Sequence, residues 1–204
     1  MVFWYLGLFM IAFLMGMLDV PSFFTFLAVA LYIILSVPYI MPILWSKDPE
    51  RMYAYLKKSR NLFYRFLYFY LKEDIESANQ IAGKMRPGKL KDMALVMLDL
   101  KQKRYGEARK ILTNIKDGVF KHYYLAVISL EEGDESGYAA HREKVTDRDY
   151  RTWLEIEELA KRGKFSEALS LVDTQISILR GIKLLSAIHY RNELVNRKDS
   201  EQEG

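Results

Sequence analysis

The stretch VFWYLGLFMIAFLMGML, residues 2–18, carries no charged side chain. Its length is near the short end of the roughly 17–25 residues that a membrane-spanning helix needs. A second and longer apolar stretch covers residues 23–45, and only the four residues DVPS at 19–22 separate the two. Because so short a link forces the two helices to run antiparallel, the sequence predicts a two-helix transmembrane hairpin over residues 1–45.

Two other interpretations of these apolar stretches are weaker. A cleaved signal peptide would begin with a positively charged segment and end at small residues, and neither feature precedes Asp19. A hairpin buried inside a soluble protein would need a core large enough to enclose two helices that are apolar all round, and the remaining chain cannot supply one. Pro38 and Pro42 are compatible with membrane helices when neighbouring groups bind the freed carbonyls.

Charge changes abruptly after residue 45. All 30 lysines and arginines follow that point, whereas Asp19 is the only charged residue before it. By the positive-inside rule, we expect the N-terminus and the charged part of the chain to be cytoplasmic and Asp19 to face outward. The side chains expected at the membrane interface, with the lipid bilayer as their partner, are Trp45, Lys47, Arg51, Lys57, Lys58, Phe63 and Tyr64.

The composition also excludes classes of function. The formal net charge is +4, and positive and negative residues are mixed throughout residues 46–204. Such mixing is typical of a solvated surface, whereas binding of nucleic acid would need basic residues on one face. The chain has no cysteine. Disulfides, thiolate catalysis and cysteine-bound metals are therefore excluded.

Residues 46–58 are expected to form a juxtamembrane helical linker. Asp48 can cap a helix, Pro49 suits its first turn, and Glu50 favours the positive end of the helix dipole. Beyond this segment the apolar residues follow a helical spacing, and no alternating strand pattern of useful length occurs. The sequence therefore predicts an all-α protein.

The part that follows the linker repeats itself every 30 residues. Glu73, Lys103, Gly133 and Gly163 are evenly spaced, and each lies in a sequence typical of a turn. Apolar residues recur at fixed distances before and after each of these turns, which gives each flanking helix one apolar stripe. A helix–turn–helix unit of this kind cannot bury its stripe alone and stacks on its neighbours. A coincidental pattern in an ordinary helical bundle is the alternative.

Two of these turns resemble the tetratricopeptide repeat. They are KRYGEA at residues 103–108 and GKFSEA at 163–168, where an aromatic residue opens the second helix and an alanine follows where the helices approach closely. The resemblance covers residues 59–180 and implies a short α-solenoid with a concave face that holds a peptide or a helix. The period of 30 is shorter than that family's roughly 34, and Tyr138 replaces the alanine in the third unit.

These patterns define the remaining boundaries. Residues 59–195 are expected to form the helical-repeat domain, including a C-terminal helix that caps the last unit. Residues 196–204 (NRKDSEQEG) are rich in charge and are expected to be a disordered tail.

No residue cluster indicates chemistry. His122, His141 and His189 lie far apart, and none has a metal-binding spacing. No phosphate-binding glycine loop or nucleophile elbow is present. We therefore expect no enzymatic activity, no cofactor and no metal. An enzyme with an unrecognised site is a weaker alternative that a co-purifying cofactor or metal would favour.

Binding is the more promising role. The inner face of the stacked first helices is expected to carry a partner-binding groove formed by Met93, Met97, Tyr123 and Trp153. Because apolar periodicity does not distinguish a groove from an interior, formation of core by these four residues is the alternative, and it is slightly favoured.

Two functions follow from these features. The first is a membrane-anchored helical-repeat adaptor that recruits partner proteins at the cytoplasmic face. The second is an accessory or regulatory subunit of a membrane complex or transporter that acts through its hairpin. Self-association into a homo-oligomer is compatible with both.

Overall fold

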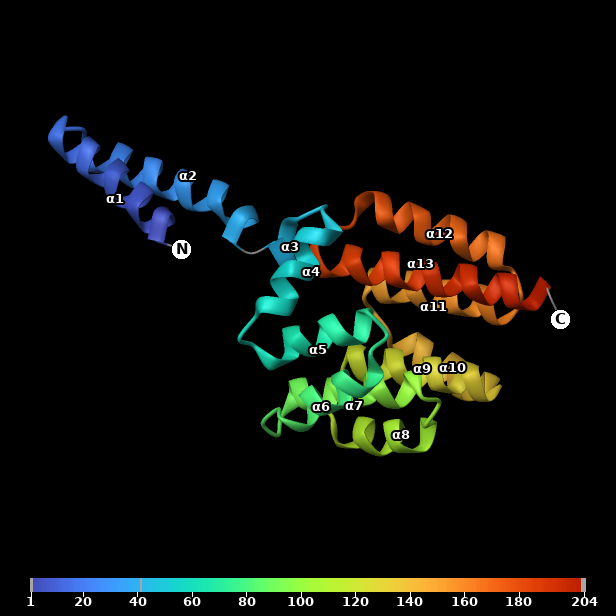
Figure 1. The fold of residues 1–204 in the computed structure, drawn as a ribbon. Coiled ribbons are helices and arrows are strands. Elements are labelled where there is room, and N and C mark those ends of the chain that lie inside the picture. Colours follow the sequence, from blue (N-terminus) through green and yellow to red (C-terminus); the bar gives the residue numbers. More distant parts are fainter. Residues whose placement is uncertain (1, 41, 203–204) are drawn as a thin grey trace.

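The computed structural model describes residues 2–40 and 42–202, which form thirteen helices and no strand (Figure 1). This confirms the all-α class. The helices are α1 (Val2–Met17), α2 (Ser22–Ile40), α3 (Pro42–Trp45), α4 (Pro49–Lys58), α5 (Leu62–Leu71), α6 (Ile75–Gly83), α7 (Lys89–Lys101), α8 (Tyr105–Asn114), α9 (Val119–Glu132), α10 (Glu135–Lys144), α11 (Arg148–Lys161), α12 (Phe165–Ile178) and α13 (Gly181–Gln202).

Helices α1 and α2 form an antiparallel hairpin that projects away from the remaining helices, which we call the body (Figure 1). The turn between them places Asp19 in the left-handed region, at φ 49°. Gly7 allows the two helices to approach closely, because a Cβ atom there would lie 2.4 Å from the Tyr32 hydroxyl. The antiparallel arrangement agrees with the prediction from the short DVPS link.

Within residues 2–40 and 42–202, no helix combines the length and the apolar character needed to cross a membrane. The α1 helix has 16 residues and α2 has 19. The second apolar stretch was expected to continue to Trp45, but α2 ends at Ile40 and the short α3 begins at Pro42; residue 41 lies outside the described residues. Proline ends helices because its ring lacks an N–H and clashes with the preceding turn. Ile43, the residue after Pro42, is buried in the body and does not extend the hairpin.

Helix α4 starts as the sequence predicts. The Asp48 side chain accepts hydrogen bonds from the backbone N–H groups of Glu50 (3.0 Å) and Arg51 (3.3 Å), and Pro49 occupies the first turn. This helix is more than a linker, because Met52 and Leu56 are completely buried in the largest core cluster.

Four helix pairs follow, α5/α6, α7/α8, α9/α10 and α11/α12, and their second helices begin at Ile75, Tyr105, Glu135 and Phe165. Each pair turns on a residue in the left-handed region. These residues are Glu73 (φ 60°), Lys103 (φ 56°), Gly133 (φ 75°) and Gly163 (φ 72°). They are the same four positions that mark the 30-residue period, so the period corresponds to a repeated turn geometry.

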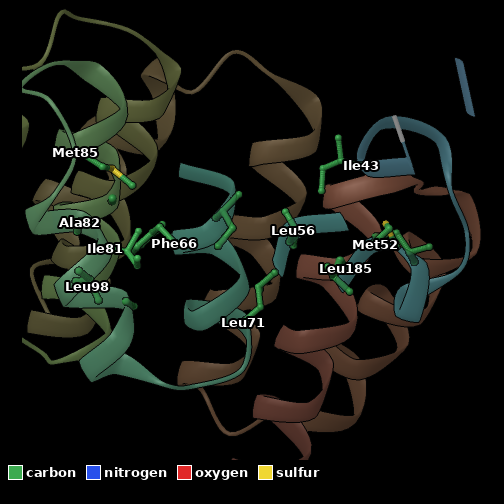
Figure 2. Packing of buried hydrophobic residues seen from close by; sticks show 14 residues of the cluster. Ile43, Met52, Leu56, Phe66, Leu71, Ile81, Ala82, Met85, Leu98 and Leu185 are labelled. Carbon is green, nitrogen blue, oxygen red and sulfur yellow. The ribbon is translucent and has the colours of Figure 1, made fainter. Parts of the chain in front are cut away.

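The largest core cluster joins segments that are distant in the sequence. Figure 2 shows Ile43, Met52, Leu56 and Leu185 on one side of this cluster and Phe66 with side chains of α6 and α7 on the other. The completely buried Phe66 stacks on Phe63 with ring centroids 6.0 Å apart. Because α13 contributes to the same cluster as α3 and α4, the end of the chain packs against the beginning of the body.

The start of α13 is held tightly against α3. The Gly181 N–H donates to the Ser46 carbonyl at 2.8 Å, and the Lys47 ammonium donates to the Ser177 carbonyl at 3.2 Å. Gly181 has φ 59°, and a Cβ atom there would lie 2.2 Å from the Ile43 carbonyl oxygen. This contact closes the body and connects α13 directly to the segment that follows the hairpin.

Helix α13 continues through residues 196–202, so the expectation of a disordered tail there is wrong. Its lysine, arginine, glutamate and glutamine residues extend a helix readily once earlier turns have formed. Residues 203–204 lie outside the described residues.

Candidate functional site

The first helices of the four pairs and α13 line a half-open cavity of about 1020 Å³. Helices α5, α7, α9 and α11 line one wall, and α13 lines the other. We call this space the inner cavity. Its wall is positioned by the packing of α5 against α7, of α9 against α11, and of α13 against α12.

Three of the four predicted groove residues line the inner cavity: Met97, Tyr123 and Trp153. Met93 is half-buried, and it is not among the lining residues. The three lining residues also pack against the buried clusters, so they belong to the core on one side and to the cavity on the other. The same three side chains therefore line the cavity and pack against the core.

Aromatic rings form much of the lining. Tyr123 lies between Tyr124 and Tyr150, with ring centroids 5.0 Å away in each case. On the opposite side, Trp153 of α11 meets Tyr190 of α13 at 6.0 Å in an edge-to-face arrangement. Burial is the largest cause that raises the pKa of these four tyrosines. Their phenols are therefore neutral near pH 7, and they offer apolar faces and hydroxyl groups.

Glu157 is one of the acidic residues that line the inner cavity, with Glu131, Asp149 and Glu193. It lies on α11, one turn after Trp153, and it lines the cavity with Tyr190. Burial raises the pKa of Glu157, whereas the nearby Tyr190 hydroxyl and Arg197 lower it. Within residues 2–40 and 42–202, no lysine or arginine forms an ion pair with this carboxylate.

Several of the other charged groups around the cavity form ion pairs. The Lys161 ammonium binds the Glu131 carboxylate at 3.1 Å. The Lys183 ammonium on α13 binds Asp149 of α11 at 2.7 Å. The Lys101 ammonium contacts Glu193 and lies 3.4 Å from Glu73. The last two groups of contacts connect α13 with α11 and α7, and the Lys161–Glu131 pair connects α11 with α9. Arg197 of α13 also lines the cavity, and its charge acts on Glu157.

Glu73, His189 and Glu193 bring three potential metal ligands within 4.8 Å of one another. The Lys101 ammonium already contacts both carboxylates, and burial followed by Lys101 lowers the pKa of His189. A metal ion would have to displace this ammonium group. The sequence does not predict this cluster, because Glu73 lies in a turn far from His189 and Glu193 along the chain.

The predicted interface residues are distributed over several environments. The Trp45 side chain is exposed, and Lys57 lies 5.9 Å from the Tyr68 ring. Phe63 and Tyr64 are half-buried and pack against the largest core cluster, as does the rest of the aromatic α5. Arg51 and Lys58 are exposed residues of α4. Helix α5 therefore supplies mainly core and cavity wall.

His122 and His141 form a pair that the sequence analysis did not predict. Their Nδ1 atoms are 3.2 Å apart, between α9 and α10, and the His122 Nε2 lies 2.8 Å from Asp117. Only one proton fits between the two Nδ1 atoms. Burial, followed by the charge of His122, lowers the pKa of His141. The other charged groups near His141 are Arg109, Asp134 and Lys144.

The lowered pKa values of His141 and His189 make stability depend on pH. In the folded state the pKa values of His141 and His189 lie below the unfolded value of 6.5. The unfolded chain therefore binds more protons in this range, and the folded state loses stability as the pH falls below 6.5. We expect a lower thermal midpoint at about pH 5.5 than at about pH 7.5, by about 2–4 °C for each kcal/mol lost.

Circular dichroism of the detergent-purified protein measures this midpoint. The variant His141→Gln removes one of the two titrating groups, so its midpoint should change less between the two pH values. An equal change in both proteins would contradict the role of His141.

Sequence signals for Glu157 and Tyr190 differ. Glu157 follows Trp153 by four residues on one helix, so the two share a face, and this spacing could have placed Glu157 in the groove. Tyr190 had no such signal, because local periodicity does not say which wall the last helix covers.

Comparison of the chain with protein-family models, with curated proteins and with solved structures found no match. The function is therefore inferred from the hairpin and the inner cavity alone.

Proposed function

We propose that this protein is a membrane-anchored helical-repeat adaptor, which holds a partner protein in its inner cavity at the cytoplasmic face. The observation that carries the proposal is the cavity formed by α5, α7, α9, α11 and α13, with Met97, Tyr123 and Trp153 in its wall. Cavities with mostly apolar and aromatic walls and a few polar groups are typical binding sites.

The four helix pairs support the interpretation of α5–α12 as a short α-solenoid that resembles tetratricopeptide repeats. Their equal period and their common left-handed turns agree with stacked identical units. Helix α13 would then be the capping helix of the array, with its inner side facing the cavity.

The exposure of the hairpin supports membrane anchoring. Except for Leu90 and Ile178, the exposed large apolar side chains of the described residues all lie within residues 5–45. Phe9, Phe26 and Ile34, for example, are each exposed by about two thirds or more of their surface. Apolar surface of this extent is unfavourable in water and marks contact with lipid or protein. The absence of charge from α1 and α2 agrees with lipid.

The adaptor proposal predicts a specific partner. Affinity purification of the full chain from detergent extracts should recover the same protein in repeated experiments, and Trp153→Ala should reduce its recovery. Preservation of helical content in the variant must be checked. If repeated affinity purifications of the wild-type protein recover no specific partner, the adaptor function is contradicted.

A second candidate is an accessory subunit of a membrane complex that acts through its hairpin. The contact of Gly181 with Ile43 favours it, because this contact couples the segment after the hairpin to α13 and so to the cavity wall. Replacing residues 1–40 by an unrelated spanning hairpin separates the two functions. Retained partner binding and cellular function support the adaptor, and loss of function with intact partner binding supports the subunit.

A further inference from the structure

The net positive charge of the chain is concentrated directly after the hairpin. Residues 46–72 contain seven lysines and arginines and two acidic residues, whereas residues 73–204 contain 23 basic and 23 acidic residues. The two acidic residues, Asp48 and Glu50, both lie at the start of α4, where Asp48 caps the helix. The segment that contains α4 and α5 therefore carries an excess of five positive charges, and the rest of the body is formally neutral.

Part of this charge forms one continuous surface on the outer side of α4 and α5. The Lys57 ammonium of α4 lies 5.9 Å from the Tyr68 ring of α5, and the Lys72 ammonium at the end of α5 lies 4.3 Å from the Tyr53 ring of α4. The two tyrosine rings meet edge to face, with centroids 6.3 Å apart. Arg65 precedes Lys72 by seven residues, so both lie on the same side of α5. We call this surface the outer face, and it consists of Tyr53, Lys57, Lys58, Arg65, Tyr68 and Lys72.

The cations of the outer face have no carboxylate partner. Among the residues that the structure describes, no ion pair involves Lys57, Lys58, Arg65 or Lys72. The three lysines are exposed, and Arg65 and the tyrosines are half-buried. The outer face therefore offers several positive charges next to aromatic rings, which is a surface for an anionic partner.

The position of the outer face favours lipid headgroups as that partner. Helix α4 begins four residues after Trp45, where the exposed apolar surface of the hairpin segment ends. Figure 1 shows α3 and α4 next to the hairpin, and the ten residues of α4 span only about 15 Å. Tyrosine rings are typical of the membrane–water interface, and lysine and arginine clusters that directly follow a spanning segment bind anionic lipids.

The outer face is separate from the inner cavity. None of its six residues lines the cavity, because the opposite side of α5 supplies Leu67, Tyr70 and Leu71 to that wall. A lipid at the outer face and a partner in the cavity can therefore be bound at the same time.

We propose that the outer face binds the headgroups of anionic phospholipids in the leaflet that contains the end of the hairpin, and so holds the body against the membrane. This inference rests on the proposed membrane anchoring. It adds a lipid class, a binding surface and a fixed placement of the body, which the hairpin alone does not provide.

A single fluorophore on α4 can report this contact. Because the chain has no cysteine, Ala54→Cys provides one labelling site on the exposed side of α4, one turn before Lys58. The labelled full chain is placed in nanodiscs of phosphatidylcholine, with or without phosphatidylglycerol, that contain a lipid with a quenching nitroxide on its headgroup. We expect stronger quenching when phosphatidylglycerol is present. High salt should remove the difference, because the Debye length falls to about 3 Å at 1 M.

The triple variant Lys57→Gln, Lys58→Gln and Lys72→Gln tests the outer face. Each basic residue near an anionic bilayer contributes about 1 kcal/mol, or about fivefold in the ratio of bound to free body. The triple variant should therefore lose about 100-fold in this ratio and show the quenching of the phosphatidylcholine nanodisc. The matched control, Lys116→Gln with Lys144→Gln and Arg148→Gln, removes the same charge from other exposed positions and should respond like the wild type.

Equal quenching in the two kinds of nanodisc, or an unchanged response in the triple variant, would overturn the inference. A basic segment that only sets the topology during insertion would give equal quenching. Loss of the affinity-purified partner in the triple variant, without any response to lipid charge, would overturn it in favour of an acidic protein partner.

The same nanodiscs distinguish this failure from failure of the anchoring. If the full chain enters both kinds of bilayer and resists a salt wash, but position 54 does not respond to phosphatidylglycerol, the anchoring stands and the lipid recognition is wrong. If the chain enters neither bilayer, both proposals are wrong.

Discussion

Gly181→Ala is expected to lower the free energy of unfolding by about 3–5 kcal/mol, because it combines backbone strain with a steric clash. Gly181 has φ 59°, and a Cβ atom would meet the Ile43 carbonyl oxygen at 2.2 Å and the Leu44 carbonyl carbon at 2.7 Å. These are backbone atoms, which cannot move aside as a flexible side chain could. The start of α13 would have to separate from α3, and the 2.8 Å hydrogen bond to Ser46 would be lost.

Gly163→Ala provides the matched control for this substitution. Gly163 has a similar φ of 72°, but no atom lies within 4 Å of the position of its Cβ. Gly163→Ala should lower the free energy of unfolding only by the backbone strain, about 1–2 kcal/mol. Urea unfolding of both variants, followed by circular dichroism, measures the difference. Equal destabilisation would show that α13 does not pack closely on α3.

Removal of residues 2–40 is expected to move the protein almost completely from the membrane fraction to the soluble fraction. The described core begins at Ile43 and extends to Leu194, so the deletion leaves every buried cluster intact. It removes most of the exposed large apolar side chains at the same time. Cell fractionation with a high-salt wash, which weakens surface charge interactions, measures the distribution.

A charged substitution inside the hairpin complements the deletion. Phe13 lies in α1 and is 56% exposed, so Phe13→Lys leaves the body intact and places a charge on the apolar surface. It should reduce membrane insertion, since a lysine at the centre of a membrane helix costs about 2.5–3.5 kcal/mol. Release of the unaltered full chain by salt alone would indicate peripheral attachment and would contradict the prediction.

Local signals predicted the helix pairs well. Asp48 and Pro49 mark the start of α4, and the spacing of Glu73, Lys103, Gly133 and Gly163 marks four turns with one backbone geometry. Such features depend on a few neighbouring residues, so they can be read without knowledge of distant contacts. Met97, Tyr123 and Trp153 line the cavity for the same reason, because they share one face of successive first helices.

Long-range contacts could not be predicted. The burial of Ile43 depends on its contact with α13, and Met52 and Leu56 lie in a core that α13 completes. Tyr190 reaches the cavity, and residues 196–202 extend α13, through packing that helical periodicity does not encode. Residues 42–45 are the clearest example. They continue the apolar stretch of the second hairpin helix in the sequence, but they form α3, which packs against α4 and α13 of the body.

We propose that the hairpin lies in a lipid bilayer and that the body lies in the cytoplasm. Because the chain has no cysteine, single cysteines introduced by Asp19→Cys and by Glu155→Cys can be labelled separately in intact cells with a membrane-impermeant maleimide. Asp19 marks the tip of the hairpin, and Glu155 is exposed on the body. The account predicts labelling at position 19 in intact cells and at position 155 only after permeabilisation. Equal labelling of both positions on one side of the membrane would contradict it.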